Sequence, residues 1–376
     1  MDTNYKRLES LDVLRGFDLF CLVGLCGFLH SLRPVIATSW YDSFLWNFSH
    51  VAWVGFSPWD LVMPLFMFMA GVSMPFALSR YKNDPDKWAV YKRIVKRVIL
   101  LWIFGMMCQG NLLGLDPNRV YLFSNTLQSI AVGYLISALL FLHARPSVQV
   151  VTAFCLLIAY WAAMQFISVD GYGGGDYTKD GNLAEWIDRM VLGRFRDGAV
   201  VDVGQVVFSE IYRYTWILSS LNFVVTVLTG VFAGQILKSK IDQKRKWQWL
   251  LGIGVAMVVL GWLWGMQIPV IKKIWTSSMV LVSSGYCFLL MGLFYYWIDY
   301  KGHRKYLTWL KVYGMNSIVA YMLANVINFS CIGASLFYGL EQYIGDLYAC
   351  LMKLSTVLII YGILWLLYKH KIFLKV

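Results

Sequence analysis

Charged residues are scarce in this chain of 376 residues, since only 14% are Asp, Glu, Lys or Arg. Soluble domains usually carry about 25% charged residues, so a soluble globular protein is excluded. The hydrophobic share is 59%, and the charges are clustered along the chain. This clustering leaves apolar stretches of roughly 20 residues, which is the length a helix needs to cross a bilayer. The composition therefore predicts an all-α, polytopic transmembrane helical bundle.

Several familiar signatures are also missing. The seven cysteines lie in or beside apolar segments and form no CxxC pair, so we interpret them as small core residues and not as a disulfide framework. No HxxxH or Cys/His pairing is present, and we expect no metal site. A GxSxG elbow, a P-loop and a dinucleotide fingerprint are likewise lacking. No small-residue cleavage site follows the first apolar run, so we expect no cleavable signal peptide.

Basic residues are distributed unevenly between the predicted loops. With ten spans and an inner N-terminus, 22 of the 33 Lys and Arg residues fall in inner segments and 10 in outer ones. Positive residues concentrate in cytoplasmic loops, so both termini are predicted to be cytoplasmic. Topology thus accounts for the net charge of +12 without a nucleic-acid partner. The predicted spans are 11–32, 60–79, 98–115, 125–143, 148–167, 215–237, 247–266, 275–298, 309–331 and 348–368.

The longest predicted connection, at about 168–214, faces outward. It contains eight acidic and five basic residues. A long outer loop of this kind is typical of a lid that handles a substrate, and a solvated connector is the alternative. We interpret 1–376 as a single transmembrane domain that carries this periplasmic loop.

The first predicted span contains three charged residues. A charge at the bilayer centre costs about 2.5–3.5 kcal/mol on insertion scales, so such residues are candidates for function. Asp12, Arg15 and Asp18 are spaced three residues apart and share a helix face. Arg15 can pair with either acid, or its planar guanidinium can bind an anionic cofactor such as a phosphate. The residues alone leave both interpretations open.

One of the five histidines, His50, lies among aromatic residues in a predicted outer loop, shortly before Asp60 begins the second apolar run. Histidine can act as a general base or form an acyl adduct near neutral pH. Interfacial packing is the alternative for His50. Polar islands inside other spans indicate either helix–helix hydrogen bonds or a polar tunnel. These islands lie at 125–129, 219–222, 276–278 and 316–317.

Seven short blocks follow one another along the chain. They are RLESLDVLRGFDLF, SHVAWVGFSPWDLVMPLFMFMAGVSMPF, NTLQSIAVGYLI, GGGD…N…WIDRMVLG, LTGVFAGQIL, KKIWTSSMVL and YGMNSIVAY. In this order they resemble the heparan-α-glucosaminide N-acetyltransferase family and its bacterial relatives. The resemblance implies a multi-span acyltransferase that uses acetyl-CoA from the cytoplasm to acetylate an amino sugar on the outer side. It also implies a place in the bacterial inner membrane.

The resemblance also assigns roles to individual residues. The family's active histidine is followed by a small residue, a tryptophan, a glycine and an aspartate, and this pattern falls on His50 and ends at Asp60. Asp60 would orient the imidazole or stabilise its charge. Family members often have an arginine where this chain has Ser129, and Arg15 or Arg97 would substitute for it. The resemblance thus assigns acetyl-CoA to Arg15, Arg97, Gln128 and Ser129, and the acceptor to Trp53, Asn316 and Ser317.

Animal members of the family carry a longer luminal region and an additional span. A compact bacterial-type protein is therefore expected here, and its acceptor would be a free amino sugar or an exposed glucosamine in a glycan. By family analogy a homodimer is expected. Two other functions stay open at this point. An N-acetylglucosamine-type permease would use the polar islands as a path, whereas a scaffold without chemistry would leave His50 and Asp60 unexplained.

Overall fold

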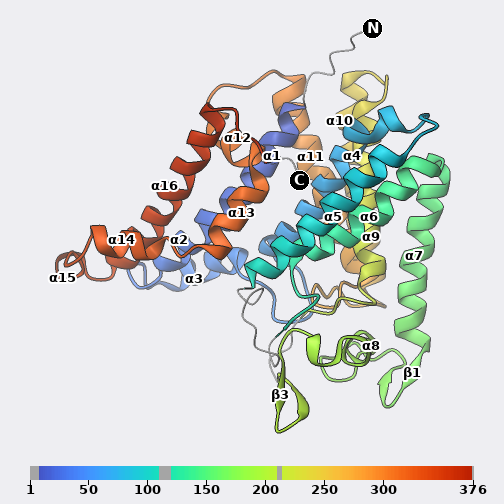
Figure 1. The fold of residues 1–376 in the computed structure, drawn as a ribbon, viewed down its shortest axis with the longest axis horizontal. Helices are drawn as coiled ribbons and strands as arrows, with labels where there is room; N and C mark the ends of the chain where they lie inside the picture. Colours follow the sequence, from blue (N-terminus) through green and yellow to red (C-terminus); the bar gives the residue numbers. More distant parts are fainter. Residues whose placement is uncertain (1–7, 110–119, 210–213, 375–376) are drawn as a thin grey trace.

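The computed structural model describes residues 8–109, 120–209 and 214–374, and most of these residues are helical. Figure 1 shows long helices packed side by side, with a small cap of α8 and short strands at the end of the bundle opposite the start of α1. The elements are α1 (Glu9–Phe20), η1 (Cys21–Leu25), α2 (Cys26–Ser31), α3 (Ser39–Leu45), η2 (Trp46–Phe48), η3 (Pro58–Leu61), α4 (Val62–Leu78), η4 (Ser79–Tyr81), α5 (Trp88–Cys108), α6 (Thr126–His143), α7 (Pro146–Phe166), β1 (Ser168–Val169), β2 (Tyr172–Gly173), α8 (Leu183–Leu192), η5 (Gly193–Phe195), β3 (Ala199–Asp202), β4 (Gln205–Phe208), α9 (Ser220–Lys238), α10 (Gln243–Gly265), α11 (Ser277–Phe294), η6 (Tyr295–Tyr300), α12 (Thr308–Met315), α13 (Ser317–Val326), α14 (Ser330–Leu336), α15 (Glu341–Ile344) and α16 (Leu347–Lys369).

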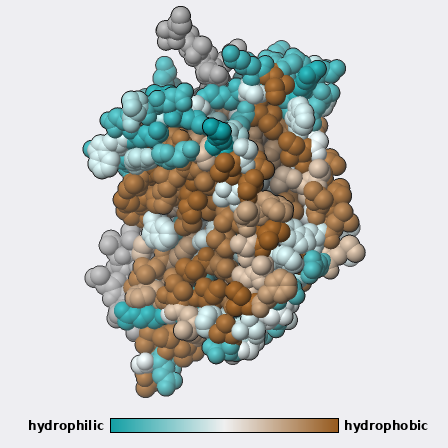
Figure 2. Space-filling model, turned by 90° about the vertical axis from the view of Figure 1, so that its right-hand side faces the viewer, coloured by the Kyte–Doolittle hydropathy of each residue, from teal (hydrophilic) through white to brown (hydrophobic). Residues whose placement is uncertain are grey.

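Within the described ranges, eight helices are long and apolar enough to cross a membrane, or nine if the bent pair α13–α14 forms one span. On the surface, a broad apolar band lies between two hydrophilic ends (Figure 2). The prediction of an all-α polytopic bundle is confirmed, and the protein is a multi-pass membrane protein. The count of ten spans and the cytoplasmic location of both termini stay predictions.

Two predicted spans differ in the structure. The span predicted at 98–115 corresponds to α5, which begins at Trp88 because its basic first turns are helical as well. The end of that predicted span lies outside the described residues. The span predicted at 309–331 is divided: Asn316, with φ −120° and ψ 43°, separates α12 from α13, and α13 meets α14 at a bend of 66°.

Close helix packing fixes the position of α4, which carries part of the candidate site. Gly71 of α4 and Gly230 of α9 face each other's helix, and a Cβ on either would overlap a backbone carbonyl oxygen of the other helix. Gly16 of α1 and Gly314 of α12 meet in the same way. Small residues allow helices in a membrane to approach closely and gain van der Waals contact. Substitution by larger residues at these glycines would force the helices apart.

The cap, residues 168–208, consists of the hairpins β1–β2 and β3–β4 on either side of α8. It is held together by a buried ion pair between Glu185 and Arg196. Asp188 accepts a hydrogen bond from the backbone N–H of Trp216 at 2.8 Å, and this bond ties the cap to the segment before α9. Burial raises the pKa of Asp188 to about 7. The cap is therefore a folded unit anchored to the bundle.

Candidate active site

His50 and Asp60 meet at the end of the bundle that carries the cap. His50 Nδ1 lies 2.7 Å from Asp60 Oδ1. The carboxyl side chain of Asp60 is only 2% exposed, whereas the imidazole of His50 is 49% exposed. A buried acid thus holds one ring nitrogen of a histidine whose other ring nitrogen is available to a ligand.

The loop before α4 brings the two residues together because Asp60 also caps the η3 turn. Asp60 Oδ2 accepts a hydrogen bond from the backbone N–H of Ser57 at 3.1 Å. The Ser57 hydroxyl donates to the carbonyl oxygen of Ser49 at 2.6 Å, which closes the loop that contains His50. Pro58 stands at the first position of the turn, where its missing N–H costs nothing. One carboxylate therefore starts the helix with one oxygen and binds His50 with the other.

Lys272 is a third charged member of this cluster, and in the sequence it is only one of the ten basic residues in predicted outer segments. Its Nζ lies 3.3 Å from Asp60 Oδ1 and 3.3 Å from His50 Nδ1. The residue is only 6% exposed. The α10–α11 connection places it there by running beside the His50 loop, with the N–H of Gly55 donating to the carbonyl of Val270 at 2.8 Å. One signal in the sequence could have pointed to this residue. Lys272 and Lys273 are adjacent lysines on the predicted outer side, where basic residues are otherwise the minority.

The three groups define a preferred protonation pattern. A carboxylate that accepts the Nδ1–H of His50 favours the tautomer in which Nε2 carries a lone pair, which is the form that acts as base or nucleophile. Lys272 offsets the negative charge of Asp60. Burial lowers the pKa of Lys272 from its ordinary value of 10.5 to about 8, and attraction to Asp60 opposes this shift.

The lowered pKa of Lys272 predicts a pH-dependent stability. Between about pH 8 and 10.5 the unfolded chain keeps a proton that the folded protein has lost, so this residue makes the folded state more stable as pH rises, by up to about 1.4 kcal/mol per pH unit. We expect the melting temperature of the wild type, minus that of Lys272→Met, to increase from about pH 7.5 to about pH 9.5. Thermal unfolding in detergent measures this difference, and a constant difference would show that Lys272 keeps its proton.

A cavity of about 240 Å³ adjoins His50 and is called here the histidine cavity. Its lining is aromatic and polar, with Lys272 as its cation. The remaining lining residues are Leu22, Trp59, Val62, Met63, Phe66, Ser124, Asn125, Thr126, Tyr214, Trp216 and Tyr321. An aromatic lining with a few hydrogen-bonding groups suits a sugar-sized ligand, because orientation comes from the polar groups.

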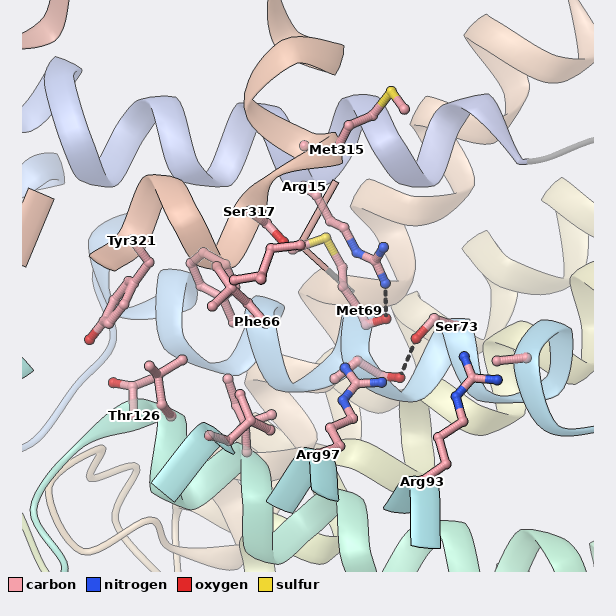
Figure 3. A pocket seen from close by; sticks show the side chains of 18 residues that line it. Arg15, Phe66, Met69, Ser73, Arg93, Arg97, Thr126, Met315, Ser317 and Tyr321 are labelled. Atoms are coloured by element: carbon pink, nitrogen blue, oxygen red, sulfur yellow. Dashed lines mark hydrogen bonds between the residues drawn. The ribbon is translucent and has the colours of Figure 1, made fainter. Parts of the chain in front are cut away.

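A second cavity of about 250 Å³, called here the arginine cavity, lies between α1, α4, α5 and α13. Figure 3 shows the side chains of Arg15, Arg93 and Arg97 directed into it. Arg15 donates to the carbonyl oxygen of Met69 at 3.1 Å, and the guanidinium of Arg97 lies 4.1 Å from the ring centre of Tyr134. Among the described residues that line this cavity none is acidic, so its field favours an anion.

The arginine cavity and the histidine cavity are neighbours. Phe66, Thr126 and Tyr321 line both. The hydroxyl of Tyr321 donates to Asn125 Oδ1 at 3.5 Å, which connects α13 to the start of α6. Three side chains therefore form the boundary between the cationic cavity and the one that contains His50.

Ser317, which the resemblance assigns to the acceptor, lines the arginine cavity and not the histidine cavity, and its binding role stays a prediction. Its neighbour Asn316 is 1% exposed and binds the C-terminal segment: its Nδ2 donates to the carbonyl of Ile372 at 3.0 Å, and its Oδ1 accepts from the N–H of Leu374 at 3.2 Å. Leu374 also lines the arginine cavity. A direct contact of Asn316 with an acceptor stays a prediction, since its carboxamide is engaged with this segment.

Three further predicted residues line neither the arginine cavity nor the histidine cavity. Gln128 accepts hydrogen bonds from the N–H groups of Ser124 and Asn125, so it caps α6, and Ser129 is buried behind it. Trp53 donates from its indole N–H to the carbonyl of Tyr177 at 2.9 Å and lines an open groove against the cap. The structure brings none of the three to His50, and their binding roles stay predictions.

Comparisons with known proteins agree with the resemblance. Residues 7–184 match the family model described as heparan-alpha-glucosaminide N-acetyltransferase, catalytic. The human protein named heparan-alpha-glucosaminide N-acetyltransferase is 27% identical over 369 residues, which cover 84% of this chain and 52% of the human protein. The mouse protein of the same name is 27% identical over 365 residues, 84% of this chain and 53% of its own length. The chain is thus similar to the heparan-α-glucosaminide N-acetyltransferase family, both in the stretch matched by the family model and over most of its length in the two relatives.

The chain spans about half the length of the curated relatives it matches. The stretch matched by the family model includes the His50–Asp60 pair together with Arg15, Arg93 and Arg97. Lys272 lies beyond it.

Proposed function

We propose that the protein transfers an acetyl group from acetyl-CoA in the arginine cavity to the amine of an amino sugar in the histidine cavity. The shared wall of Phe66, Thr126 and Tyr321 is the observation that carries this proposal, because it places a cationic cavity directly beside the cavity that contains His50. The names of the human and mouse relatives support N-acetyl transfer to a glucosamine-containing acceptor.

His50 Nε2 is the reacting atom in either of two routes. In the covalent route Nε2 attacks the thioester carbonyl, the C–S bond breaks, and CoA leaves as a thiolate that takes up a proton. The neutral amine of the sugar then attacks the acetyl-imidazole, the C–Nε2 bond breaks, and the amine loses a proton. In the direct route the amine attacks the thioester carbonyl while Nε2 takes the amine proton, the C–S bond breaks, and CoA leaves as a thiolate that takes up a proton. Asp60 orients the ring through Nδ1 in both.

The arginine cavity suits the phosphates of CoA. Guanidinium groups bind phosphate through paired hydrogen bonds, and three of them line the cavity. The Nε of Arg97 is buried and has no hydrogen-bond partner among the described residues. A phosphate oxygen would supply that partner. We place the arginine cavity on the cytoplasmic side of the membrane and the cap on the outer side, as the basic loops predict. The bacterial inner membrane and a homodimer stay predictions.

Loss of Arg97 or Arg15 is expected to weaken CoA binding. A hydrogen bond to a charged group contributes about 1.5–3 kcal/mol, so Arg97→Gln or Arg15→Gln should raise the Kd for CoA roughly 10- to 100-fold. The salt dependence of binding should also become smaller, because fewer charges contribute. Isothermal titration at two salt concentrations measures both. Arg245→Gln, an exposed arginine on α10, is the matched control and should bind like the wild type. An unchanged Kd for both variants would remove the two arginines from the site.

Purified protein in proteoliposomes tests the function directly. Given labelled acetyl-CoA and glucosamine, it should form labelled N-acetylglucosamine at a rate that depends on both substrates. A permease would instead move labelled N-acetylglucosamine across the liposome membrane without acetyl-CoA. Sugar flux with no acetyl transfer would overturn the proposal in favour of the permease.

A further inference from the structure

A third cavity, of about 600 Å³, shares Trp59 with the histidine cavity and is called here the apolar cavity. It is enclosed by α1, the loop before α4, the start of α4, and α11. Its lining is mostly hydrophobic, with Phe48, Leu65 and Leu290 among its members. The volume falls within the range of about 300–1,000 Å³ that is usual for ligand pockets. The proposed acetyl transfer makes no use of it.

The apolar cavity opens toward the bilayer. Phe17 of α1 and Leu293 of α11 stand in its wall and are 37% and 51% exposed. Both belong to helices long and apolar enough to span the membrane, so the surface around them faces hydrocarbon. A hydrocarbon chain can enter from the membrane without being transferred through water, whereas a polar ligand would lose its hydration.

The apolar cavity also adjoins the catalytic groups. Trp59 and Val62 line both this cavity and the histidine cavity, and the rings of Trp59 and His50 have centres 6.5 Å apart. A molecule that lay across this boundary would place its tail among apolar side chains and its head beside His50.

The wall of the apolar cavity holds one unsatisfied polar group. Asp18 is 2% exposed, and its Oδ2 has no hydrogen-bond partner among the described residues. A buried polar atom without a partner is costly, so it points to a ligand that supplies one. A hydroxyl or a similar donor in the linkage between a sugar and a hydrocarbon chain would do so, which a bare alkane could not.

We propose that the acceptor amino sugar is carried on a membrane lipid, whose chain lies in the apolar cavity while its amine reaches His50. This inference rests on the proposed acetyl transfer and adds the acceptor class to it: a glycolipid with an amino-sugar head group.

A series of alkyl glucosaminides tests the proposal. Methyl, butyl and octyl glucosaminides are supplied below their micellar concentrations to wild-type protein in proteoliposomes with labelled acetyl-CoA, and kcat/KM is measured for each. We expect kcat/KM to rise about tenfold or more from methyl to octyl, since buried methylene groups add binding energy. Membrane partitioning also enriches the longer acceptors, so the decisive quantity is how this octyl-to-methyl ratio changes in variants.

Leu290→Trp should fill the apolar cavity, and Leu293→Trp should narrow its opening at a half-exposed position that tolerates a larger side chain. Both are expected to lower the octyl-to-methyl ratio at least about fivefold. Val259→Trp is the control, because Val259 is 51% exposed on α10 and lies outside all three cavities. Partitioning of the acceptors into the membrane is the same for every variant. A difference in the octyl-to-methyl ratio between variants therefore reports a site that binds the alkyl chain.

A lower ratio in Leu290→Trp and Leu293→Trp but not in Val259→Trp would support the glycolipid acceptor. The same ratio in all four proteins would overturn it, and so would equal kcat/KM for methyl and octyl acceptors in the wild type. If the wild type acetylates none of the acceptors although it binds CoA, the proposed acetyl transfer itself fails. Elution of each variant as a single species in gel filtration, with wild-type CoA affinity, shows that the variants are folded.

Discussion

His50→Ala is expected to lower the rate of acetyl transfer by a factor of at least about 10³, because the reacting nitrogen is removed in either route. Asp60 and Lys272 remain paired with each other in this variant, so the surrounding structure should persist. The measurement is steady-state transfer from labelled acetyl-CoA to glucosamine in proteoliposomes. Incubation with labelled acetyl-CoA alone adds a second readout: label that stays on the wild type after denaturation, and is missing from His50→Ala, identifies the covalent route.

His303→Ala is the matched control for this experiment. His303 is exposed and stacks on Trp297, with ring centres 4.2 Å apart, and lines neither the histidine cavity nor the arginine cavity. Its variant should transfer acetyl at the wild-type rate. If His50→Ala retained a rate within tenfold of the wild type, His50 would be a packing residue, and the proposed mechanism would be wrong.

Asp60→Asn is expected to lower kcat by roughly 10³- to 10⁴-fold, the size of effect seen when an aspartate that orients a catalytic histidine becomes an amide. An asparagine amide can donate to Nδ1, which would move the ring proton to Nε2 and remove the lone pair that reacts. The affinity for CoA should stay unchanged, because Asp60 does not line the arginine cavity. Transfer kinetics and CoA titration on the same preparation separate these two effects.

The carbonyl oxygen of an asparagine can still accept from the N–H of Ser57, so Asp60→Asn should keep the η3 turn. Asp42→Asn is the control, since Asp42 pairs with Arg33 on the exposed loop after α2, with N and O 2.7 Å apart. A kcat near the wild-type value in Asp60→Asn would show that the carboxylate serves the fold of the loop alone. A second outcome would also assign Asp60 to the fold of the loop alone. In it, Asp60→Asn would lower both kcat and the melting temperature strongly, and Asp60→Glu would restore no part of the rate.

Local features of the chain were enough to predict part of the site. The length of each apolar stretch indicates whether a helix can cross the membrane, so the membrane bundle could be predicted from the distribution of apolar residues. His50 and Asp60 are ten residues apart on one loop, and their contact depends only on how that loop closes onto α4.

The remaining features depend on contacts between segments far apart in the chain, which spacing does not encode. Lys272 is 212 residues from Asp60 and reaches it only because the α10–α11 connection runs beside the His50 loop. The shared wall of the two cavities needs α4, α6 and α13 together. Gln128 has a capping role that its place in a predicted membrane span did not indicate, since its side-chain oxygen accepts from the N–H groups of Ser124 and Asn125 just before α6. The sequence by itself determined the class of protein and that His50 and Asp60 lie on one short loop, because these rest on residues close together in the chain. Only the tertiary structure decided the cation beside this pair and the cationic cavity next to it, because helix packing sets both.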